Sequence, residues 1–378
     1  MSLNEFITLG RSGLKISRLC LGTMTFGNSE WGTDENASRA IFNRYVEAGG
    51  NFFDTADGYA GGRSEEILGK FIVERKLRDR VVVATKFTFN ADPGNPNAGG
   101  NGRKNIYRAL EGSLRRLQTD YVDLYYQHIW DRVTPVEEVL GTLDILVREG
   151  KIHYFAFSDT PAWYIARAQT LAEKEGKNRA IALQLEYSLV ERNIEREHIP
   201  AAQEFGMGIC PWSPIAGGFL AGKYKREGGS AAGAGRLHVT RQSESPALKK
   251  FSEQNWQILD AVLDVAKQLG KSPAQVALNW AATQPGITSP IIGATKMLQF
   301  EDNLAAIDFS IPAELRKHLD DASALPLIHP YMFFGSYIQN MISGGATINR
   351  WMPAEIGYAT PAVETSPAQK PKASAAER

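Results

Sequence analysis

Four polar residues within the first 128 positions are of the types that can assist the reduction of a carbonyl group. They are Asp54, Tyr59, Lys86 and His128. Reduction of a ketone places a hydride on carbon and leaves an alkoxide that must receive a proton. A tyrosine hydroxyl can supply this proton if its pKa, about 10 in water, falls towards neutrality. A nearby lysine ammonium stabilises the phenolate and would lower that pKa.

We therefore interpret Tyr59 as the proton donor and Lys86 as the cation that lowers its pKa. Asp54 would pair with Lys86 and hold it in place. His128 would orient the carbonyl oxygen and stabilise the charge that develops there. Each residue alone has a structural explanation, as a helix cap, a packed ring, a solvated lysine or a structural histidine. Because each one ends or closely follows a short apolar run, the four together favour catalysis.

Those apolar runs belong to a regular alternation of predicted strands and helices. Near-continuous hydrophobic runs are typical of parallel strands that are covered on both faces. Helix starts with Ser or Thr followed by proline, in the manner of a capping box, are predicted at Thr134, Thr160 and Ser272. Amphipathic stretches predict further helices at residues 36–48, 106–117 and 299–306. The eight predicted strands are residues 19–23, 51–54, 81–86, 121–127, 152–158, 181–186, 207–212 and 289–292.

Eight such alternations, without a glycine-rich dinucleotide fingerprint, predict an α/β fold of the closed (β/α)8 TIM barrel class. In such a barrel the reactive residues lie at the carboxyl ends of the strands, where the four candidates are found. Residues 5–9 and 15–17 predict an N-terminal β-hairpin that covers the bottom of the barrel. A glycine-rich and proline-rich loop at residues 90–102 predicts mobility, and the long loop at residues 217–246 predicts a lid.

We expect three parts along the chain. Residues 1–330 would form the barrel, residues 331–358 a C-terminal aromatic extension, and residues 359–378 a disordered tail. The 42 basic and 42 acidic side chains cancel and form no long block of one sign, which argues against nucleic-acid binding. No apolar run approaches the roughly 20 residues that span a bilayer, and the N-terminus has no signal-peptide pattern. Cys20 and Cys210 are expected to be buried reduced thiols, which predicts a cytoplasmic protein.

Several motifs in this chain resemble those of the aldo-keto reductase superfamily. Residues 54–59 (DTADGY) resemble its signature around the catalytic aspartate and tyrosine, and residues 61–69 (GGRSEEILG) resemble the helix that follows it. Thr85-Lys86 matches the position of the catalytic lysine. Residues 126–131 (YQHIWD) resemble the strand that ends in the family's histidine. The likeness extends in order over residues 5–325, and it implies the same four roles that the chemistry suggests.

The resemblance implies an enzyme that reversibly reduces an aldehyde or ketone with NADP(H), and a cofactor that lies extended across the barrel mouth. Trp212 would stack on the nicotinamide, Ser158 and Gln184 would hold its carboxamide, and Lys223 would pair with a phosphate. Arg236 would also reach the cofactor. The family's cofactor-binding positions fall here on Gly22, Thr23, Met24, Asp54, Ser158, Asp159, Gln184, Trp212, Ser213, Pro214, Ile215, Gly217, Gly218, Leu220, Lys223, Gly293, Thr295, Lys296, Gln299 and Asn303.

Two of these positions depart from the family pattern. Many relatives carry arginine one position before Lys296, where this chain has Thr295. A lysine lacks the planar fork of arginine, so NADP preference would rest on Lys296 as a point charge at a helix N-terminus. Relatives usually have Ser-Asn where this chain has Ser158-Asp159. An ionised aspartate only accepts hydrogen bonds, so we predict altered cofactor affinity that Asp159→Asn would change.

The substrate is expected to be a small carbonyl or alcohol compound held by Met24, Trp31, Phe87 and Trp130, whose character suggests an apolar or ring-bearing molecule. Three other functions stay open. A regulatory or channel-associated NADP-binding subunit on the same fold would turn over little substrate. Residues 217–224 (GGFLAGKY) nearly match a phosphate-binding P-loop, but Tyr224 replaces its final Ser or Thr. A metal-dependent barrel hydrolase would need a second ligand near His128, and we expect no metal. The sequence leaves the oligomeric state open.

Overall fold

A computed structural model of the chain describes residues 3–226, 236–240 and 244–347. The chain divides into two units, residues 1–325 and residues 326–378, which are described separately. The predicted three-part division of the chain stays a prediction, and the tail at residues 359–378 lies outside the described part.

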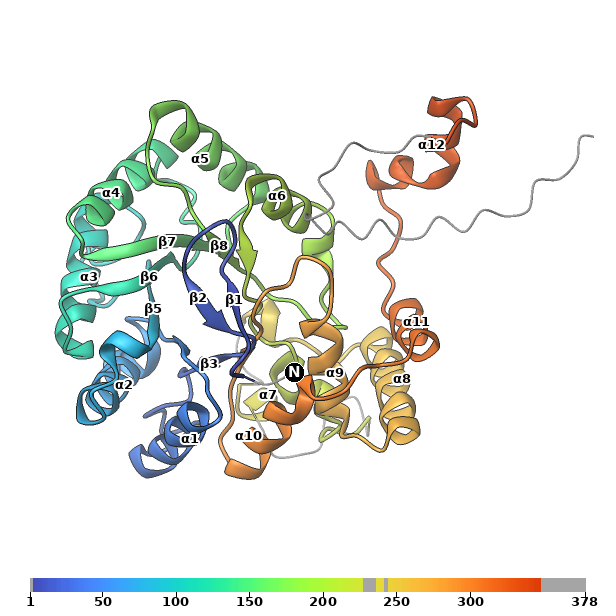
Figure 1. Cartoon of the computed structure of the whole chain (residues 1–378), viewed down its shortest axis with the longest axis horizontal. Helices are drawn as coiled ribbons and strands as arrows, with labels where there is room; N and C mark the ends of the chain where they lie inside the picture. Colours follow the sequence, from blue (N-terminus) through green and yellow to red (C-terminus); the bar gives the residue numbers. More distant parts are fainter. Residues whose placement is uncertain (1–2, 227–235, 241–243, 348–378) are drawn as a thin grey trace, which may run out of the picture. The chain divides into compact units, whose positions relative to one another are not determined.

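The first unit is built on one curled sheet of eight parallel strands (Figure 1). The order of the strands is β10-β3-β4-β5-β6-β7-β8-β9, so from β3 to β9 neighbours along the chain are also neighbours in the sheet. Each predicted strand is found, with shorter bounds in most cases, and the predicted α/β class is confirmed. The strands are β3 (Cys20–Gly22), β4 (Phe52–Asp54), β5 (Val82–Phe87), β6 (Val122–Gln127), β7 (Ile152–Ser158), β8 (Ala182–Gln184), β9 (Gly208–Ile209) and β10 (Ile291–Ile292).

Backbone hydrogen bonds also connect the segments at the two ends of the strand order. The Thr288 amide donates to the Ile209 carbonyl at 2.8 Å, and the Ile291 amide donates to the Pro211 carbonyl at 2.8 Å. Ile209 and Ile287 form a parallel bridge. The chain before β10 therefore runs beside the chain at β9.

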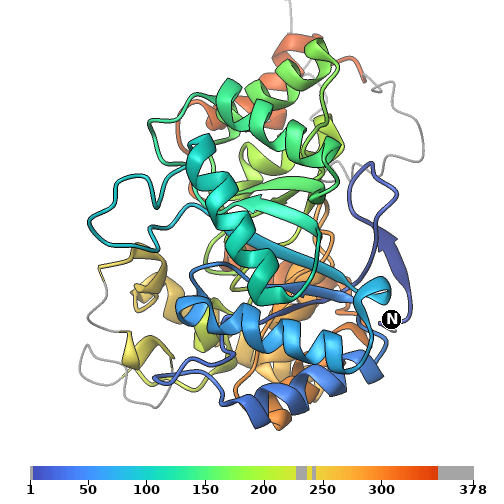
Figure 2. The same cartoon turned by 90° about the vertical axis from the view of Figure 1, so that its left-hand side faces the viewer.

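An antiparallel hairpin, β1 (Phe6–Thr8) and β2 (Lys15–Ser17), precedes the sheet, as predicted. Gly10 in its turn has a φ of +58°, and a Cβ there would lie 2.5 Å from the Ile181 carbonyl oxygen. Only glycine can approach the chain before β8 so closely. Figure 2 shows the hairpin at one end of the sheet and residues 236–240 towards the opposite end.

The helices of the first unit bury apolar side chains in the core. In α4, for example, Val139, Leu143 and Leu146 are fully buried, at a helical spacing of three or four residues. The α-helices are α1 (Glu35–Glu47), α2 (Arg63–Glu74), α3 (Arg103–Leu117), α4 (Val136–Arg148), α5 (Ala162–Glu175), α6 (His198–Phe205), α7 (Arg236–Val239), α8 (Glu253–Leu269), α9 (Pro273–Ala282), α10 (Met297–Leu304) and α11 (Ala313–Ala322). The short 3-10 segments are η1 (Tyr59–Gly62), η2 (Arg78–Arg80), η3 (Asn193–Glu195), η4 (Ala216–Ala221), η6 (Pro246–Leu248) and η7 (Ala305–Ile307).

One of the three predicted capping boxes forms. Ser272 caps α9, because its hydroxyl accepts from the Gln275 amide while the Gln275 side chain accepts from the Ser272 amide. The capping boxes predicted at Thr134 and Thr160 were wrong. The Thr134 hydroxyl donates instead to Asp131 Oδ2 at 2.6 Å, and the Thr160 hydroxyl donates to the Ser158 carbonyl at 2.9 Å. Both helices begin one residue later than predicted, with Pro135 and Pro161 at the cap position, so each threonine lies one residue before the cap.

Besides the core between the sheet and the helices, a second cluster of buried side chains lies on the other face of the curled sheet. It takes side chains from successive strands, such as Phe52, Leu124 and Ala156, together with Cys20 and Cys210. Both cysteines are free and fully buried, which confirms the prediction of buried thiols. Burial raises the pKa of both thiols well above the usual value.

The loop at residues 90–102 is more firmly attached than its composition predicted. The Gly100 amide donates to the Thr88 carbonyl at 2.7 Å. Asn101 is fully buried, and it donates to Asp131 Oδ2 at 2.8 Å and to the Ile129 carbonyl at 2.9 Å. These bonds hold the end of the loop against the chain that follows β6. The predicted lid at residues 217–246 is described only in part, because residues 227–235 and 241–243 lie outside the described residues.

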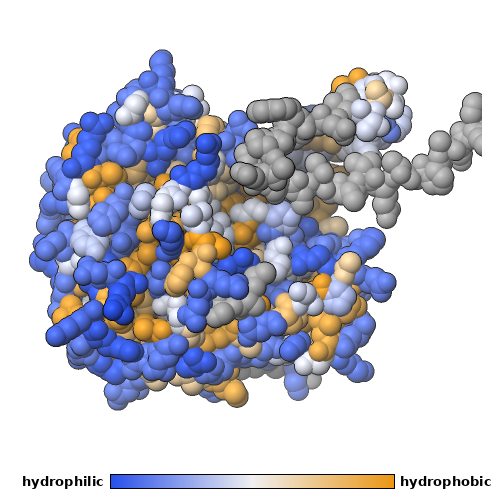
Figure 3. Space-filling model, in the orientation of Figure 1, coloured by the Kyte–Doolittle hydropathy of each residue, from blue (hydrophilic) through white to orange (hydrophobic). Residues whose placement is uncertain are grey.

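The second unit is described to residue 347 and contains η8 (Tyr331–Phe334) and α12 (Ser336–Ser343). Large apolar side chains on both segments are exposed, among them Phe334, Tyr337 and Ile342. Figure 3 shows this mixture of hydrophobic and polar surface on the unit. No helix in the described ranges of either unit is long and apolar enough to cross a bilayer.

Candidate active site

The four candidate residues meet where neighbouring parallel strands end. Asp54 is the last residue of β4, Lys86 lies near the end of β5, and His128 follows β6 directly. Tyr59 opens η1, in the connection that leaves β4. Because β4, β5 and β6 are adjacent and parallel, their carboxyl ends bring these side chains to one place.

Lys86 is the centre of a buried hydrogen-bond network. Its Nζ donates to Asp54 Oδ1 at 2.5 Å, to the Thr55 carbonyl at 2.8 Å and to the Tyr59 hydroxyl at 3.1 Å. The Lys86 side chain is completely buried. Burial lowers the pKa of Lys86, but the charge of Asp54 and the bonds to Asp54 and Tyr59 outweigh it, so the pKa lies above its usual value. Lys86 is therefore a cation that touches the Tyr59 hydroxyl.

The pKa of Tyr59 is raised in the structure, and not lowered as expected. Burial of the phenol raises the pKa of Tyr59, Lys86 lowers it, and Asp54 raises it again. The net shift is upward because burial, the largest effect, together with the charge of Asp54 outweighs the ammonium that was expected to acidify the phenol. Tyr59 therefore holds its proton at neutral pH. The contribution of Lys86 is to stabilise the phenolate when that proton leaves.

His128 is neutral at the pH of the cell. Burial and the charge of Lys86 lower the pKa of His128 well below its usual value. Its ring lies edge-on to Tyr59, with centroids 5.8 Å apart, and to Phe89, with centroids 4.7 Å apart. Its Nδ1 has no hydrogen-bond partner among the residues that the structure describes. A neutral imidazole can donate one hydrogen bond to an oxygen placed beside the Tyr59 hydroxyl.

Gln184 plays a part that the sequence did not indicate. It ends β8, and its Nε2 donates to Asp54 Oδ2 at 2.8 Å. The two residues are 130 positions apart, and no pattern in the sequence pairs them. With Lys86 on one oxygen and Gln184 on the other, both carboxylate oxygens of Asp54 are held by hydrogen bonds.

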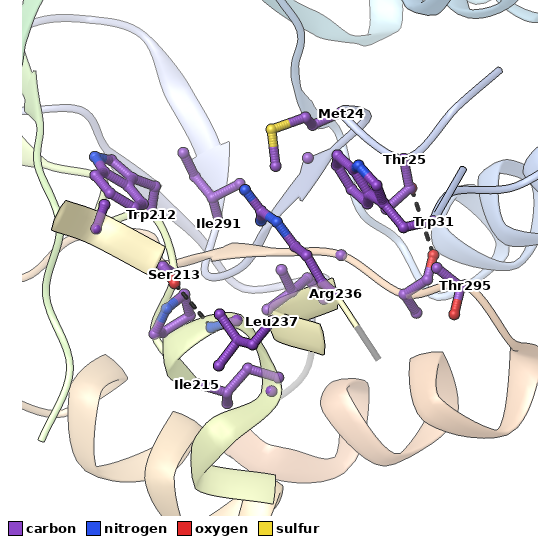
Figure 4. Close-up of a pocket in the computed structure, with 18 of the residues that line it drawn as sticks. Met24, Thr25, Trp31, Trp212, Ser213, Ile215, Arg236, Leu237, Ile291 and Thr295 are labelled. Carbon is purple, nitrogen blue, oxygen red and sulfur yellow. Dashed lines mark hydrogen bonds between the residues drawn. The ribbon is translucent and has the colours of Figure 1, made fainter. Parts of the chain in front are cut away.

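A cleft of about 900 Å³ opens beside this network (Figure 4). Most of the predicted site residues line it, and they come from segments spread between β3 and α10. They are Gly22, Met24, Trp31, Asp54, Tyr59, His128, Ser158, Asp159, Gln184, Trp212, Ser213, Pro214, Ile215, Gly217, Gly218, Lys223, Gly293, Thr295, Gln299 and Asn303. Phe89, Val239 and Leu248 also line it and were not predicted.

Six predicted residues are absent from the lining. Lys86 lies behind Tyr59, as described above. Thr23 and Leu220 are fully buried, and the Thr23 hydroxyl bonds to the Asp54 carbonyl at 3.1 Å. Phe87, predicted to hold substrate, is fully buried and packs on Tyr125. Its neighbour Phe89 faces the cleft instead.

The other two are exposed to different degrees outside the cleft. Trp130, also predicted to hold substrate, packs edge-on against Trp163 with ring centroids 5.6 Å apart. Lys296 is exposed at the N-terminus of α10. It lies near enough to Lys223 for its charge, after burial, to lower the pKa of Lys223.

A tight turn at η4 forms one wall of the cleft. Gly217 and Gly218 have φ values of +63° and +88°, and the Ser213 hydroxyl accepts from the Gly217 amide at 3.0 Å. A Cβ on Gly218 would lie 2.7 Å from Lys223 Nζ, so this lysine folds back over the glycine. The turn thus combines close backbone approach with a cation. Tyr224 is buried, and its hydroxyl accepts from the Leu237 amide at 3.2 Å.

Arg236 extends into the cleft from α7, between Trp212 and Trp31 (Figure 4). Its guanidinium carbon lies 4.7 Å from the centre of the Trp31 ring, a cation–π distance. Its Nε has no hydrogen-bond partner among the described residues, and burial lowers the pKa of its guanidinium. The cleft therefore holds two cations, Lys223 and Arg236, over an otherwise largely apolar wall.

Asp159 and Trp212 form a polar pair that also lines the cleft. Trp212 Nε1 donates to Asp159 Oδ1 at 3.2 Å. Asp159 follows β7 with a φ of +38°, a strained value for a residue other than glycine. Burial raises the pKa of Asp159 to about 7, against the bond from Trp212. The neighbouring Ser158 hydroxyl has no partner among the described residues.

The chain matches known proteins over most of its length. The Aldo/keto reductase family model matches residues 18–324. An uncharacterized oxidoreductase of Bacillus subtilis is 38% identical, over 84% of this chain and 95% of the relative. An aryl-alcohol dehydrogenase [NADP(+)] of Phanerodontia chrysosporium is 33% identical, over 85% and 86% respectively. A probable voltage-gated potassium channel subunit beta of Oryza sativa is 36% identical, over 80% and 91%.

The four candidate residues of the site all fall within the matched segment. The predicted resemblance is confirmed, and the chain belongs to the aldo/keto reductase family.

Proposed function

We propose that this protein catalyses the reversible NADP(H)-dependent reduction of an aldehyde or ketone to an alcohol. The observation that carries this proposal is the chain of hydrogen bonds from Asp54 through Lys86 to the hydroxyl of Tyr59, which faces the cleft. Such a chain has no evident structural purpose, since a buried ion pair is expensive to place and stabilises little. When bound, NADPH supplies the hydride.

The lining of the cleft fits a dinucleotide phosphate. The η4 turn offers backbone to a pyrophosphate, and Lys223 and Arg236 supply positive charge beside it. Trp212 would stack on the nicotinamide, while Ser158, Asp159 and Gln184 would hold its carboxamide. Several polar atoms that a ligand could satisfy have no partner among the described residues, among them Ser158 Oγ and Arg236 Nε.

The adenosine end would lie at the start of α10. Gly293, Thr295, Gln299 and Asn303 line this part of the cleft. The exposed side chain of Lys296 is the cation that a 2′-phosphate would meet, which favours NADP over NAD. The relative from Phanerodontia chrysosporium, whose name includes NADP(+), supports this preference.

The residues of the chain perform the proton transfer. The Tyr59 hydroxyl donates its proton to the carbonyl oxygen as the alkoxide forms, and the ammonium of Lys86 stabilises the phenolate left behind. Asp54 and the Thr55 carbonyl keep Lys86 in position. The neutral ring of His128 donates to the same oxygen and orients it. In the direction of alcohol oxidation the same groups act in reverse.

The walls near Tyr59 suit an aromatic or otherwise apolar substrate. Met24, Trp31, Phe89 and Val239 line the cleft and contribute apolar surface. The relative named aryl-alcohol dehydrogenase supports an aryl aldehyde and its alcohol as the pair.

The proposal includes the rest of the molecule. We infer that the sheet closes into a (β/α)8 barrel, because residues 209–211 bond to residues 288–291. The two free buried thiols support a cytoplasmic location.

The test is a screen of NADPH oxidation against aromatic aldehydes and ketones, with Tyr59→Phe as the control. The variant keeps the ring and removes the proton donor. We expect turnover to fall by several orders of magnitude while the dissociation constant of NADPH stays within about twofold. Near-normal turnover in the variant would refute the role of Tyr59.

A second function has one observation in its favour, the similarity to the channel subunit of Oryza sativa. A regulatory subunit on this fold would bind NADPH tightly and oxidise it slowly with every carbonyl compound. Tight binding of NADPH without turnover of any compound in the screen would favour this function over the first.

A further inference from the structure

We propose that Asp159 distinguishes the oxidised from the reduced nicotinamide by its own protonation state, as a neutral acid beside NADPH and as a carboxylate beside NADP⁺. This inference rests on the proposed function. It assigns to the side chain a selective role that goes beyond holding the carboxamide.

The geometry makes Asp159 a residue that a ligand must meet. It lines the cleft together with Ser158, Gln184 and Trp212. Its backbone is held on both sides of the Cα atom, since its amide donates to the Gln184 carbonyl at 3.2 Å and its carbonyl accepts from the Trp130 amide at 3.4 Å. The bond from Trp212 Nε1 then sets the direction of the carboxyl group. A left-handed φ held by this many contacts indicates a functional position.

The two protonation states of Asp159 offer different chemistry to the ligand. A neutral carboxylic acid has one donor and one acceptor, so it can bond to both the oxygen and the nitrogen of an amide. A carboxylate can only accept, and it would repel the amide oxygen. The carboxylate gains in another way, because the oxidised nicotinamide ring carries a positive charge and the reduced ring is neutral. In a partly buried cleft this attraction is much stronger than in water.

The surroundings of Asp159 leave the two states close in free energy near neutral pH. Burial raises its pKa to about 7, the bond from Trp212 lowers it, Glu186 raises it and Lys86 lowers it. Lys86 is already paired with Asp54. Glu186 faces Lys250 at 2.7 Å, and Arg236 is the other cation that acts on it. A change of charge on the ligand can therefore decide whether Asp159 holds a proton.

This arrangement links cofactor preference to pH. Binding of NADPH would take up a proton at Asp159, and binding of NADP⁺ would not. Both ligands carry the same phosphates, so the titration of those phosphates changes both dissociation constants equally. It therefore does not affect the ratio of the two constants.

The experiment measures the dissociation constants of NADPH and NADP⁺ for the full chain by Trp fluorescence quenching between pH 6 and pH 8.5. We expect the ratio of the NADPH constant to the NADP⁺ constant to rise by about tenfold over this range in the unaltered protein. In Asp159→Asn the ratio should stay constant within about twofold. Titration calorimetry in two buffers of different ionisation enthalpy should show an uptake of up to about one proton more for NADPH than for NADP⁺ at pH 7.5.

Glu186→Gln is the matched control, because it replaces a neighbouring half-buried carboxylate by its amide. The pH dependence of the ratio should persist in this variant, and its loss there would assign the titration to Glu186 and overturn the inference. A flat ratio in the unaltered protein, with tight binding of both ligands, would overturn the inference and leave the proposed function standing. Failure to bind either ligand at every pH would overturn both.

Discussion

Replacing Lys86 by methionine tests the site most directly, because it removes one charge and keeps most of the side-chain volume. Lys86 Nζ lies 3.1 Å from the Tyr59 hydroxyl oxygen. The proposed reaction creates a phenolate at that oxygen, so the ammonium acts mainly on the state that follows proton transfer. Loss of Lys86 should therefore lower kcat rather than weaken cofactor binding.

The expected magnitude follows from the distance. Two unit charges 3.1 Å apart attract with about 5 kcal/mol at an effective dielectric constant of about 20. Asp54 lies 2.5 Å from the same ammonium and offsets part of this attraction. We therefore expect Lys86→Met to lose roughly 3 to 5 kcal/mol of transition-state stabilisation, a fall in kcat of about 10² to 10⁴-fold.

The assay is single-turnover oxidation of bound NADPH with an aromatic aldehyde at pH 7. Lys250→Met is the matched control, since Lys250 is also a buried lysine paired with a carboxylate, Glu186, and does not contact Tyr59. It should stay within about fivefold of the unaltered rate, while melting temperatures show that both variants are folded. In a Tyr59→Phe background, Lys86→Met should lower kcat only slightly further, because Lys86 acts through the hydroxyl that has been removed.

Two results would refute this reasoning. One is a rate for Lys86→Met within tenfold of the unaltered protein. The other is full additivity of the Tyr59 and Lys86 substitutions, which would mean that the lysine acts on something other than the phenol.

Two further predictions concern buried charge and the cleft wall. Asp57 is 6% exposed, and burial followed by the charge of Glu65 raises its pKa from 3.8 to about 7, so its contribution to stability is present below pH 3.8 and lost as the pH rises through about 7. The unfolding free energy of Asp57→Asn minus that of the unaltered protein should therefore be larger at pH 8 than at pH 4, by up to about 4 kcal/mol. Denaturant curves that give the same difference at both pH values would contradict this. Gly218→Ala places a Cβ 2.7 Å from Lys223 Nζ at a φ of +88°, so NADPH should bind about tenfold more weakly, and an unchanged dissociation constant would exclude the η4 turn from the cofactor site.

The secondary structure could be predicted where the residue pattern is set by local chemistry. The eight strands are recognisable because their apolar runs are short and almost continuous, as burial on both faces requires. The capping box at Ser272 forms because Gln275 is at the right spacing. The boxes at Thr134 and Thr160 do not form because α4 and α5 begin one residue later, with Pro135 and Pro161 at the cap position.

The same distinction between local pattern and tertiary contact applies to the residues predicted to surround the cleft. The predicted residues at strand ends and in the η4 turn line the cleft, because the carboxyl ends of parallel strands meet at one edge of the sheet. Phe87 and Phe89 show the limit. β5 ends at Phe87, and Thr88 has a φ of +130°, so the chain changes direction between the two rings. Phe87 is therefore buried and Phe89 lines the cleft, although a continued strand would place both on one face.

The chain by itself determined the types of reacting group and the ends of the strands that carry them, since both are properties of short segments. Only the tertiary structure decided how those groups act on one another. It placed Gln184 against Asp54 across 130 residues, and it kept the proton on Tyr59, because burial and Asp54 together outweigh the ammonium of Lys86. The pKa of a buried group depends on all the charges folded around it, and no local pattern in a sequence records that sum.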